Sequence, residues 1–277
     1  MATMTVVSCP PTRIISDNDL DQHDKSETNE DRGELSIVRE GVRKEINKQV
    51  LRQKLSKLRH LVIPQGINPA YLDSLFPHLL ENFHPQTVHY NGGIANVKEW
   101  KISCYLEVMQ GGIPCTNPNL KLLELFRPLL DVCNDLFLKW YRQQHACNVV
   151  KLNGQVERTC KRLMTFITRY TPAPGEQALL KHVDGAGKVD GSVVVALPVD
   201  RWSAPEEENS FIGHGGGLTF WDGKDSETKQ PKEIHYDTRA GDLAFIDRAV
   251  WHQADPISKG TRWALVIFYD VQSKFER

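Results

Sequence analysis

The sequence predicts a mainly β protein, a jelly roll preceded by amphipathic helices. Before about residue 155 the apolar side chains mostly recur at helical spacing, and afterwards their period shortens towards two, which is typical of strands. Eight short segments rich in β-branched and aromatic residues then follow at fairly even intervals, bounded by Gly, Pro or Asp. The helices have no sheet of their own, so we expect them to support the jelly roll on one face.

Residues 1–35 are predicted to be a disordered tail. They are polar and contain the acidic run SDNDLDQHDKSETNEDRGE, which cannot bury enough apolar surface to offset the entropy of ordering. The first sixteen residues lack the apolar core of a secretion signal, and the six cysteines of the chain are scattered. We therefore expect a cytoplasmic protein with reduced thiols, with organelle targeting as the alternative. A net charge of −1 and the lack of a long apolar run predict neither a nucleic-acid nor a membrane partner.

Residues 36–154 are predicted to form a helical region packed on the core. Apolar residues from Val38 to Leu51 recur at helical spacing, "LVIP" at 61–64 predicts a short strand, and Asn68 followed by Pro69 predicts the start of a second helix. Residues 90–117 are expected to be irregular around one apolar segment, 101–109. A third helix, kinked at its proline, has an apolar face made of Leu122, Phe126, Leu130, Cys133, Phe137 and Trp140.

The jelly-roll core is expected over residues 155–277. The eight segments predicted to be strands are 160–170, 177–183, 191–200, 216–222, 232–237, 241–247, 249–257 and 261–270.

A candidate metal site lies in the second of these segments. Side chains alternate along a strand, so His182 and Asp184 are expected to share one face, where packing alone gives no reason for an imidazole beside a carboxylate. His252, on another strand, is the best third ligand, and two histidines with one carboxylate form the facial triad of non-haem Fe(II) oxygenases. The alternatives are a buried His–Asp hydrogen bond without metal, and a rival pair, His235 and Asp237. That pair stands only 17 residues before His252 and is interpreted as polar surface.

Arg262 follows His252 by ten residues. A guanidinium is a planar fork that binds a carboxylate through two hydrogen bonds. If the two residues lie on neighbouring strands, Arg262 reaches deeper into the barrel and could hold the distal carboxylate of 2-oxoglutarate while that cosubstrate chelates the metal. The alternative is a structural ion pair with an acid such as Asp247.

The segment "HQADPISKGTRW" resembles the last conserved block of the prolyl-hydroxylase-like branch of the Fe(II)/2-oxoglutarate-dependent dioxygenases. That block has a histidine, a proline four residues later, a glycine at eight, a basic residue at ten and then tryptophan. "HVD", "GGGLTFW" and "RAGDLAFI" resemble the preceding blocks in the same order, so the resemblance covers roughly residues 160–270. It implies a double-stranded β-helix, a distorted jelly roll, with iron at one mouth.

The resemblance also implies roles for individual residues. It assigns His182, Asp184 and His252 to the metal, Arg262 to 2-oxoglutarate, and Tyr170 to a hydrogen bond with that cosubstrate. The implied cofactors are Fe(II), 2-oxoglutarate and O2, with ascorbate as an accessory reductant. Three further residues are candidates for substrate binding: Arg169 in a basic cluster, Trp202 in the insertion 201–213, and His214 in a glycine-rich loop.

The implied activity is oxidation of an unactivated C–H bond by hydroxylation, desaturation or ring closure. Asp184 argues against halogenation, because related halogenases replace this carboxylate with a small residue. No peptide-binding module is evident, which favours a small-molecule substrate, such as an amino-acid derivative in a biosynthetic pathway of the kainoid-cyclising kind. The alternatives are a protein prolyl or other side-chain hydroxylase, and a non-catalytic metal-binding or sensor protein on the same fold.

Overall fold

The computed structural model describes residues 35–85, 89–90, 93–94, 100–110, 113–114, 118–145, 156–172, 180–198, 216–225 and 227–275. These residues form three helices, one short 3-10 helix and twelve strands. The strands are β1 (His60–Ile63), β2 (His89–Tyr90), β3 (Gly93–Ile94), β4 (Lys101–Gln110), β5 (Ile113–Pro114), β6 (Val156–Tyr170), β7 (Gly191–Ala196), β8 (Leu218–Asp222), β9 (Lys232–Tyr236), β10 (Leu243–Asp247), β11 (Trp251–Ala254) and β12 (Arg262–Phe275).

Two antiparallel sheets face each other. The major sheet has the order β1-β10-β7-β12-β6-β4-β5, and the minor sheet has the order β11-β8-β9. Strands β6 and β12 pair over their whole length at the centre of the major sheet, with a register shift between Phe268 and Tyr269. Strands β2 and β3 form a separate two-stranded ribbon.

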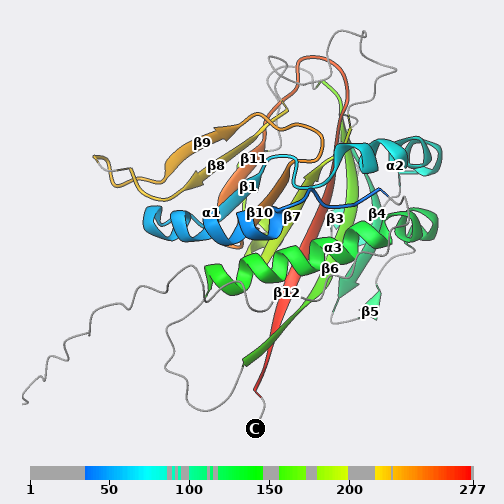
Figure 1. Ribbon diagram of the computed structural model, residues 1–277. Coiled ribbons are helices and arrows are strands. Elements are labelled where there is room, and N and C mark those ends of the chain that lie inside the picture. The colour runs from blue at the N-terminus through cyan, green and yellow to red at the C-terminus, as the bar shows by residue number, and fades with distance from the viewer. Residues whose placement is uncertain are drawn as a thin grey trace, which may run out of the picture. The chain divides into compact units, whose positions relative to one another are not determined.

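The helices cover the outer face of the major sheet (Figure 1). They are α1 (Val42–Ser56), α2 (Pro69–Asn82) and α3 (Leu120–Gln144). Every residue of the predicted apolar face of α3 is buried, and its Phe137 stacks on Tyr269 of β12 with ring centroids 4.1 Å apart. Helix α2 begins as predicted, because the Asn68 side chain accepts a hydrogen bond from the backbone N–H of Ala70. No helix of the described residues is long and apolar enough to span a membrane.

The first helix is shorter than predicted. Gly41 has a φ of 80°, a left-handed conformation that interrupts the helix, so α1 starts only at Val42. Val38 instead forms a bridge with Ile67, and Leu51 is 62% exposed. The apolar pattern before Gly41 therefore belongs to a strand-like contact and not to the helix.

The region 36–154 contains more sheet than the helical region with one short strand that was expected. It contributes β1 and β4 to the major sheet, and β4 contains the apolar segment 101–109 that was expected to lie in irregular chain. Cys104 and Leu106 of β4 pack into the core beneath the helices, while Tyr105 faces the other side of the sheet. Residues 35–277 form one compact unit, so the sheet continues across the predicted boundary at residue 155. The predicted tail, apart from Leu35, lies outside the described residues.

Seven of the eight segments predicted after residue 155 contain a strand. The exception is 177–183, where among the described residues only His182 pairs, through an isolated bridge to His252. Between the two sheets lies a second apolar layer that includes Val194, Phe220, Val250 and Ala264. Beside this layer a cavity of about 520 Å³ opens, and it contains the predicted metal ligands.

Candidate metal and cosubstrate site

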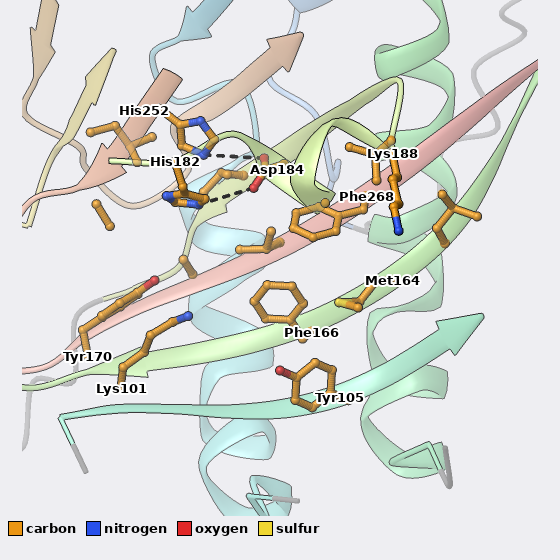
Figure 2. Close-up of a pocket in the computed structure, with 18 of the residues that line it drawn as sticks. Lys101, Tyr105, Met164, Phe166, Tyr170, His182, Asp184, Lys188, His252 and Phe268 are labelled. Carbon is orange, nitrogen blue, oxygen red and sulfur yellow. Dashed lines mark ion pairs between the residues drawn. The ribbon is translucent and has the colours of Figure 1, made fainter. Parts of the chain in front are cut away.

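His182, Asp184 and His252 converge in the lining of the cavity (Figure 2). One ligand atom of each lies within 4.8 Å of the others, and they form the one such group found among the described residues. His182 Nε2 is 3.6 Å from one oxygen of Asp184, and His252 Nε2 is 3.5 Å from the other. Two imidazole nitrogens and a carboxylate oxygen converging in this way fit a divalent metal of the Fe(II) type.

The two histidines share a face because their backbones pair, and Asp184 joins them by a turn. His182 and His252 exchange two backbone hydrogen bonds of 2.9 Å, so both side chains leave the same side of the bridge. Asp184 does not continue a strand, as was predicted, but begins a 3-10 helix, Asp184–Gly187. The chain turns there because Gly185 has a φ of 53°, and a Cβ on it would meet Val189 at 2.6 Å. The strand premise was therefore wrong, although the three side chains do come together.

Hydrogen bonds to the backbone orient both rings. His182 Nδ1 lies 2.8 Å from the Leu180 carbonyl oxygen, and His252 Nδ1 lies 3.2 Å from that of Val250. A carbonyl only accepts, so each Nδ1 carries a proton, and Nε2 is the ring nitrogen that faces Asp184. The carbonyl contacts thus leave Nε2 of each ring as the nitrogen available to a metal.

The Asp184 carboxylate is buried and strongly held in its charged form. Burial alone would raise its pKa, but the charge of His252 and hydrogen bonds from His182, His252 and Ser192 hold the pKa well below its usual range. The Ser192 hydroxyl, on β7, donates to the oxygen that also faces His252. A carboxylate that stays ionised inside the protein is suited to hold a cation.

Arg262 is almost completely buried, with 3% of its surface exposed, and all three guanidinium nitrogens lack a hydrogen-bond partner among the described residues. Burial lowers its pKa, an effect that Tyr170 and Asp255 partly oppose. The alternative partner, Asp247, instead lies 2.8 Å from His145 Nε2. A buried cation without an anion is costly, so Arg262 has the properties of an anion-binding residue in the cavity that it lines.

The condition under which Arg262 was considered, that it lies on a strand next to that of His252, is not met. They do not lie on neighbouring strands, because β11 belongs to the minor sheet and β12 to the major sheet. Both line the same cavity from opposite sheets. The nine residues between them allow the chain to cross from one sheet to the other, which places the guanidinium across the cavity from the histidines.

Arg262 belongs to a row of three side chains on adjacent strands. Both Arg262 on β12 and Lys101 on β4 are paired in register with Tyr170 on β6, and all three line the cavity. The Arg262 guanidinium lies over the Tyr170 ring, 5.3 Å from its centroid. The row gives this end of the cavity two cations and a hydroxyl group, which fits a carboxylate ligand such as the distal end of 2-oxoglutarate.

The opposite end of the cavity is aromatic and apolar. Phe166 and Tyr105 lie two steps along the strands from the row of Tyr170, and Phe166 meets Phe268 edge to face at 5.8 Å. Figure 2 shows Phe268 and Met164 on this side of the metal ligands, and Tyr170 with Lys101 on the other. Lys188, at the end of the 3-10 helix, also lines the cavity. Lys101 and the aromatic end could not be predicted from the sequence because their meeting depends on strand register, and Lys188 could not because its place depends on the 3-10 turn after Asp184.

Arg169, predicted to bind substrate, faces away from the metal. Neighbouring residues on a strand point to opposite faces, so Arg169 leaves the major sheet on the side opposite Tyr170. There it lines another hollow and lies over the rings of Phe83 and Trp263, 5.8 and 5.9 Å from their centroids. That prediction is therefore wrong for the metal cavity. Trp202 and His214 lie outside the described residues.

The rival pair lies where polar surface was expected. His235 and Asp237 are half exposed on or next to the edge strand β9, with His235 Nε2 3.1 Å from Asp237. His235 Nδ1 is 2.9 Å from Asp255, so the histidine already has two carboxylate partners. These residues do not line the cavity that contains His252.

No protein-family model matches the chain, and no curated protein matches it. Solved structures do match. A prolyl 4-hydroxylase from Phytophthora capsici has 15% identity and a TM-score of 0.51, with 86% of this chain and 67% of that chain covered. SnoK, a non-haem α-ketoglutarate-dependent carbocyclase from nogalamycin biosynthesis, has 14% identity and a TM-score of 0.51, with 82% and 85% covered. The related epimerase SnoN has 13% identity and a TM-score of 0.50, with 82% and 83% covered.

The neighbours confirm the fold class that the resemblance implied. Two are non-haem α-ketoglutarate-dependent enzymes and the third is a prolyl 4-hydroxylase, and the likeness extends over more than four-fifths of this chain. With its two facing antiparallel sheets and its His-Asp-His cluster in the cavity, this chain has the double-stranded β-helix fold of the Fe(II)/2-oxoglutarate-dependent oxygenases, prolyl hydroxylases included.

Proposed function

We propose that this protein is an Fe(II)- and 2-oxoglutarate-dependent oxygenase that oxidises an unactivated C–H bond of a small molecule. One observation carries the proposal: three candidate metal ligands line the same cavity as the buried guanidinium of Arg262, which has no hydrogen-bond partner among the described residues. A non-catalytic protein on this fold has no need to keep both. The fold of the structural neighbours agrees with the proposal.

His182, Asp184 and His252 are the residues that would hold the iron, and three ligands on one face leave the other positions free. Arg262 and Tyr170 would hold the distal carboxylate of 2-oxoglutarate, with Lys101 adding positive charge beside them. When bound, iron and 2-oxoglutarate together supply O2-dependent oxidation of a C–H bond, with ascorbate as an accessory reductant. The chain itself fixes the imidazoles, keeps Asp184 ionised and neutralises the dianionic cosubstrate.

The cavity favours a small molecule over a protein substrate. Its volume of about 520 Å³ lies within the usual range for small-molecule sites, and most of its lining away from the metal is apolar. Hydroxylation, desaturation and oxidative ring closure all begin with oxidation of a C–H bond and are all compatible with this lining. We favour an acidic biosynthetic intermediate, such as an amino-acid derivative that undergoes kainoid-type cyclisation. The second candidate is prolyl side-chain hydroxylation, which the likeness in fold to a prolyl 4-hydroxylase supports.

The cysteines support the proposed cytoplasmic location. Cys104, Cys133 and Cys160 are free thiols, and burial raises the pKa of Cys133 to about 12. Thiols of this kind persist in a reducing compartment.

The test is a titration of 2-oxoglutarate into the anaerobic, Fe(II)-loaded protein. We expect the weak visible charge-transfer band of the chelate, followed by succinate release on admission of air. The matched variant Asp184→Ala should lose the iron and the band, while its circular dichroism spectrum stays that of a folded protein. A wild-type protein that binds Fe(II) but gives neither band nor succinate would refute the proposal.

A further inference from the structure

The cavity has two chemically different ends, which three consecutive rows of side chains on β12, β6 and β4 define. The first row is Arg262, Tyr170 and Lys101; the second is Ala264, Thr168 and Ser103; the third is Val266, Phe166 and Tyr105. Successive rows on one face lie about 7 Å apart, so the first and third are separated by about 13 Å. The lining therefore changes from cationic to aromatic within the length of one small molecule.

The middle row makes room near the metal ligands. Ala264 is small, and the hydroxyl groups of Ser103 and Thr168 are hydrogen-bonded to each other at 3.2 Å. In Figure 2 the metal ligands lie between the two ends, with Tyr170 and Lys101 to one side and Phe268 and Met164 to the other. A cosubstrate drawn to Arg262 occupies the cationic end, and the aromatic end is then left for the substrate.

The aromatic end contains one cation. Lys188 caps the 3-10 helix with its backbone N–H on Gly185, 2.9 Å away, and Figure 2 shows its side chain extending along the cavity beside Phe268. Asp184 is the sole acid among the described lining residues, and both of its oxygens face the histidines. The described residues give Lys188 no acidic partner. Lys188 is exposed, so its ammonium group is free to pair with an anionic ligand beside the apolar wall.

We infer that the substrate is a small organic acid, with its carboxylate on Lys188 and an apolar body against Phe166, Phe268, Val266 and Met164. This inference rests on the proposed function for the identity of the cavity as an active site. The structure gives one cation and apolar walls at this end, which matches a single negative group on an apolar chain or ring. The apolar body then lies next to the metal ligands, so a C–H bond of that body is the one presented for oxidation.

In this arrangement Lys188 binds the carboxylate of the substrate, and the aromatic wall limits the length of the apolar body that fits. The arrangement also keeps the two acids apart: the dianionic cosubstrate pairs with Arg262 and Lys101, and the substrate carboxylate pairs with Lys188. A change at Lys188 should consequently weaken the binding of the substrate and spare 2-oxoglutarate, and a change at Arg262 should do the reverse. This difference separates the inference from the proposed function on which it rests.

The experiment is calorimetric titration of straight-chain acids, butanoate to decanoate, and of their matched primary amides. The protein is anaerobic and Fe(II)-loaded, with saturating 2-oxoglutarate so that Arg262 is occupied. We expect at least one acid to bind about ten-fold more tightly than its amide, since a charge-assisted hydrogen bond is replaced by a neutral one. In Lys188→Gln this preference should fall below about two-fold, while Lys188→Arg and the exposed control Lys44→Gln should retain it.

Two results would overturn the inference. One is that no acid of the series binds better than its amide to the wild-type protein. The other is that the preference survives unchanged in Lys188→Gln. The 2-oxoglutarate band is recorded on the same samples and should persist in Lys188→Gln. If the wild-type protein lacks that band but shows the Lys188-dependent preference, the proposed function fails and the acid-binding site stands. If it shows the band but no such preference, the proposed function stands and the acid-binding site fails.

Discussion

The backbones of His182 and His252 exchange two hydrogen bonds of 2.9 Å, although 70 residues separate them in the chain. This bridge brings the two imidazole rings to a centroid separation of 4.6 Å. Because each Nδ1 is engaged by a carbonyl oxygen, both Nε2 atoms are directed to the same side, where Asp184 lies. The geometry of the candidate metal site is thus a property of the backbone pairing as much as of the side chains.

Loss of either histidine should abolish stoichiometric Fe(II) binding. His182→Ala and His252→Ala each remove one of three ligands, and we expect affinity to fall more than about 100-fold, beyond the loss usual for residues that only support a ligand. Anaerobic equilibrium dialysis with iron analysis measures this. His235→Ala is the matched control and should bind iron as the wild type does; iron loss in that variant alone would reassign the site to β9.

Ser192→Ala should weaken the site without removing a ligand. The Ser192 hydroxyl donates to Asp184 from β7, so its loss frees the carboxylate to rotate. We expect Fe(II) affinity to fall about 10-fold to 100-fold. The measurement is competition for iron against a chromophoric chelator. Ser192→Thr, which keeps a hydroxyl group, should recover part of the affinity, and equal loss in both variants would show that packing and not the hydrogen bond is responsible.

Arg262 should control 2-oxoglutarate binding and not iron binding. Arg262→Leu removes the buried cation, so we expect the chelate band to require at least about 100-fold more 2-oxoglutarate. Arg262→Lys keeps the charge but loses the planar fork, so its effect should be intermediate. Arg169→Leu is the matched control, because its side chain lies on the opposite face of the same sheet. An unchanged titration curve in Arg262→Leu would rule out the assignment.

Lys101 should make a smaller contribution to the same ligand. It is partly exposed and one strand further from Arg262, so solvent screens its charge. We expect Lys101→Met to raise the 2-oxoglutarate Kd about three-fold to ten-fold, and this increase should shrink at high salt. Titrations at low and high ionic strength check both points. If Lys101→Met changed the preference for acid over amide and left 2-oxoglutarate binding intact, Lys101 would instead be assigned to substrate binding.

Acid should destabilise the protein partly through Asp222. Burial would raise the pKa of this carboxyl, but hydrogen bonds from His60 and from the backbone N–H groups of Arg59 and Gly223 bring it below its usual value. Because the pKa of Asp222 is lower in the folded state, its ionised carboxylate stabilises the fold at a pH above the unfolded-state pKa of about 3.9. This contribution to the free energy of unfolding is lost as the pH falls through the folded-state pKa. Urea unfolding between pH 3 and 7 should therefore show a decline below about pH 4.

The variant Asp222→Asn isolates this contribution. It should lower the free energy of unfolding at pH 7 by roughly 3 kcal/mol, because it breaks a buried pair and leaves His60 with a poorer partner. Its stability should also depend less on pH in the acid range. An acid decline in the variant as steep as in the wild type would show that other carboxylates cause it.

The sequence by itself determined the local features of this protein. Helical spacing predicted the buried face of α3, because one turn of backbone sets which residues share a side. Asn68 predicted the start of α2, since its side chain caps the first free N–H groups within two residues. Seven strands followed from β-branched runs between breakers, and the triad and Arg262 followed from the order and spacing of their motifs.

Only the tertiary structure decided which distant residues meet. The register of β12, β6 and β4 joins Arg262, Tyr170 and Lys101, and a shift by one residue would turn each of them to the other face of the sheet. Spacing alone suggested that His252 and Arg262 lie on neighbouring strands, whereas the chain between them crosses from one sheet to the other. Pairing of this kind is set by the burial of side chains from segments far apart in the chain, whereas local periodicity depends only on the geometry of the backbone within each segment.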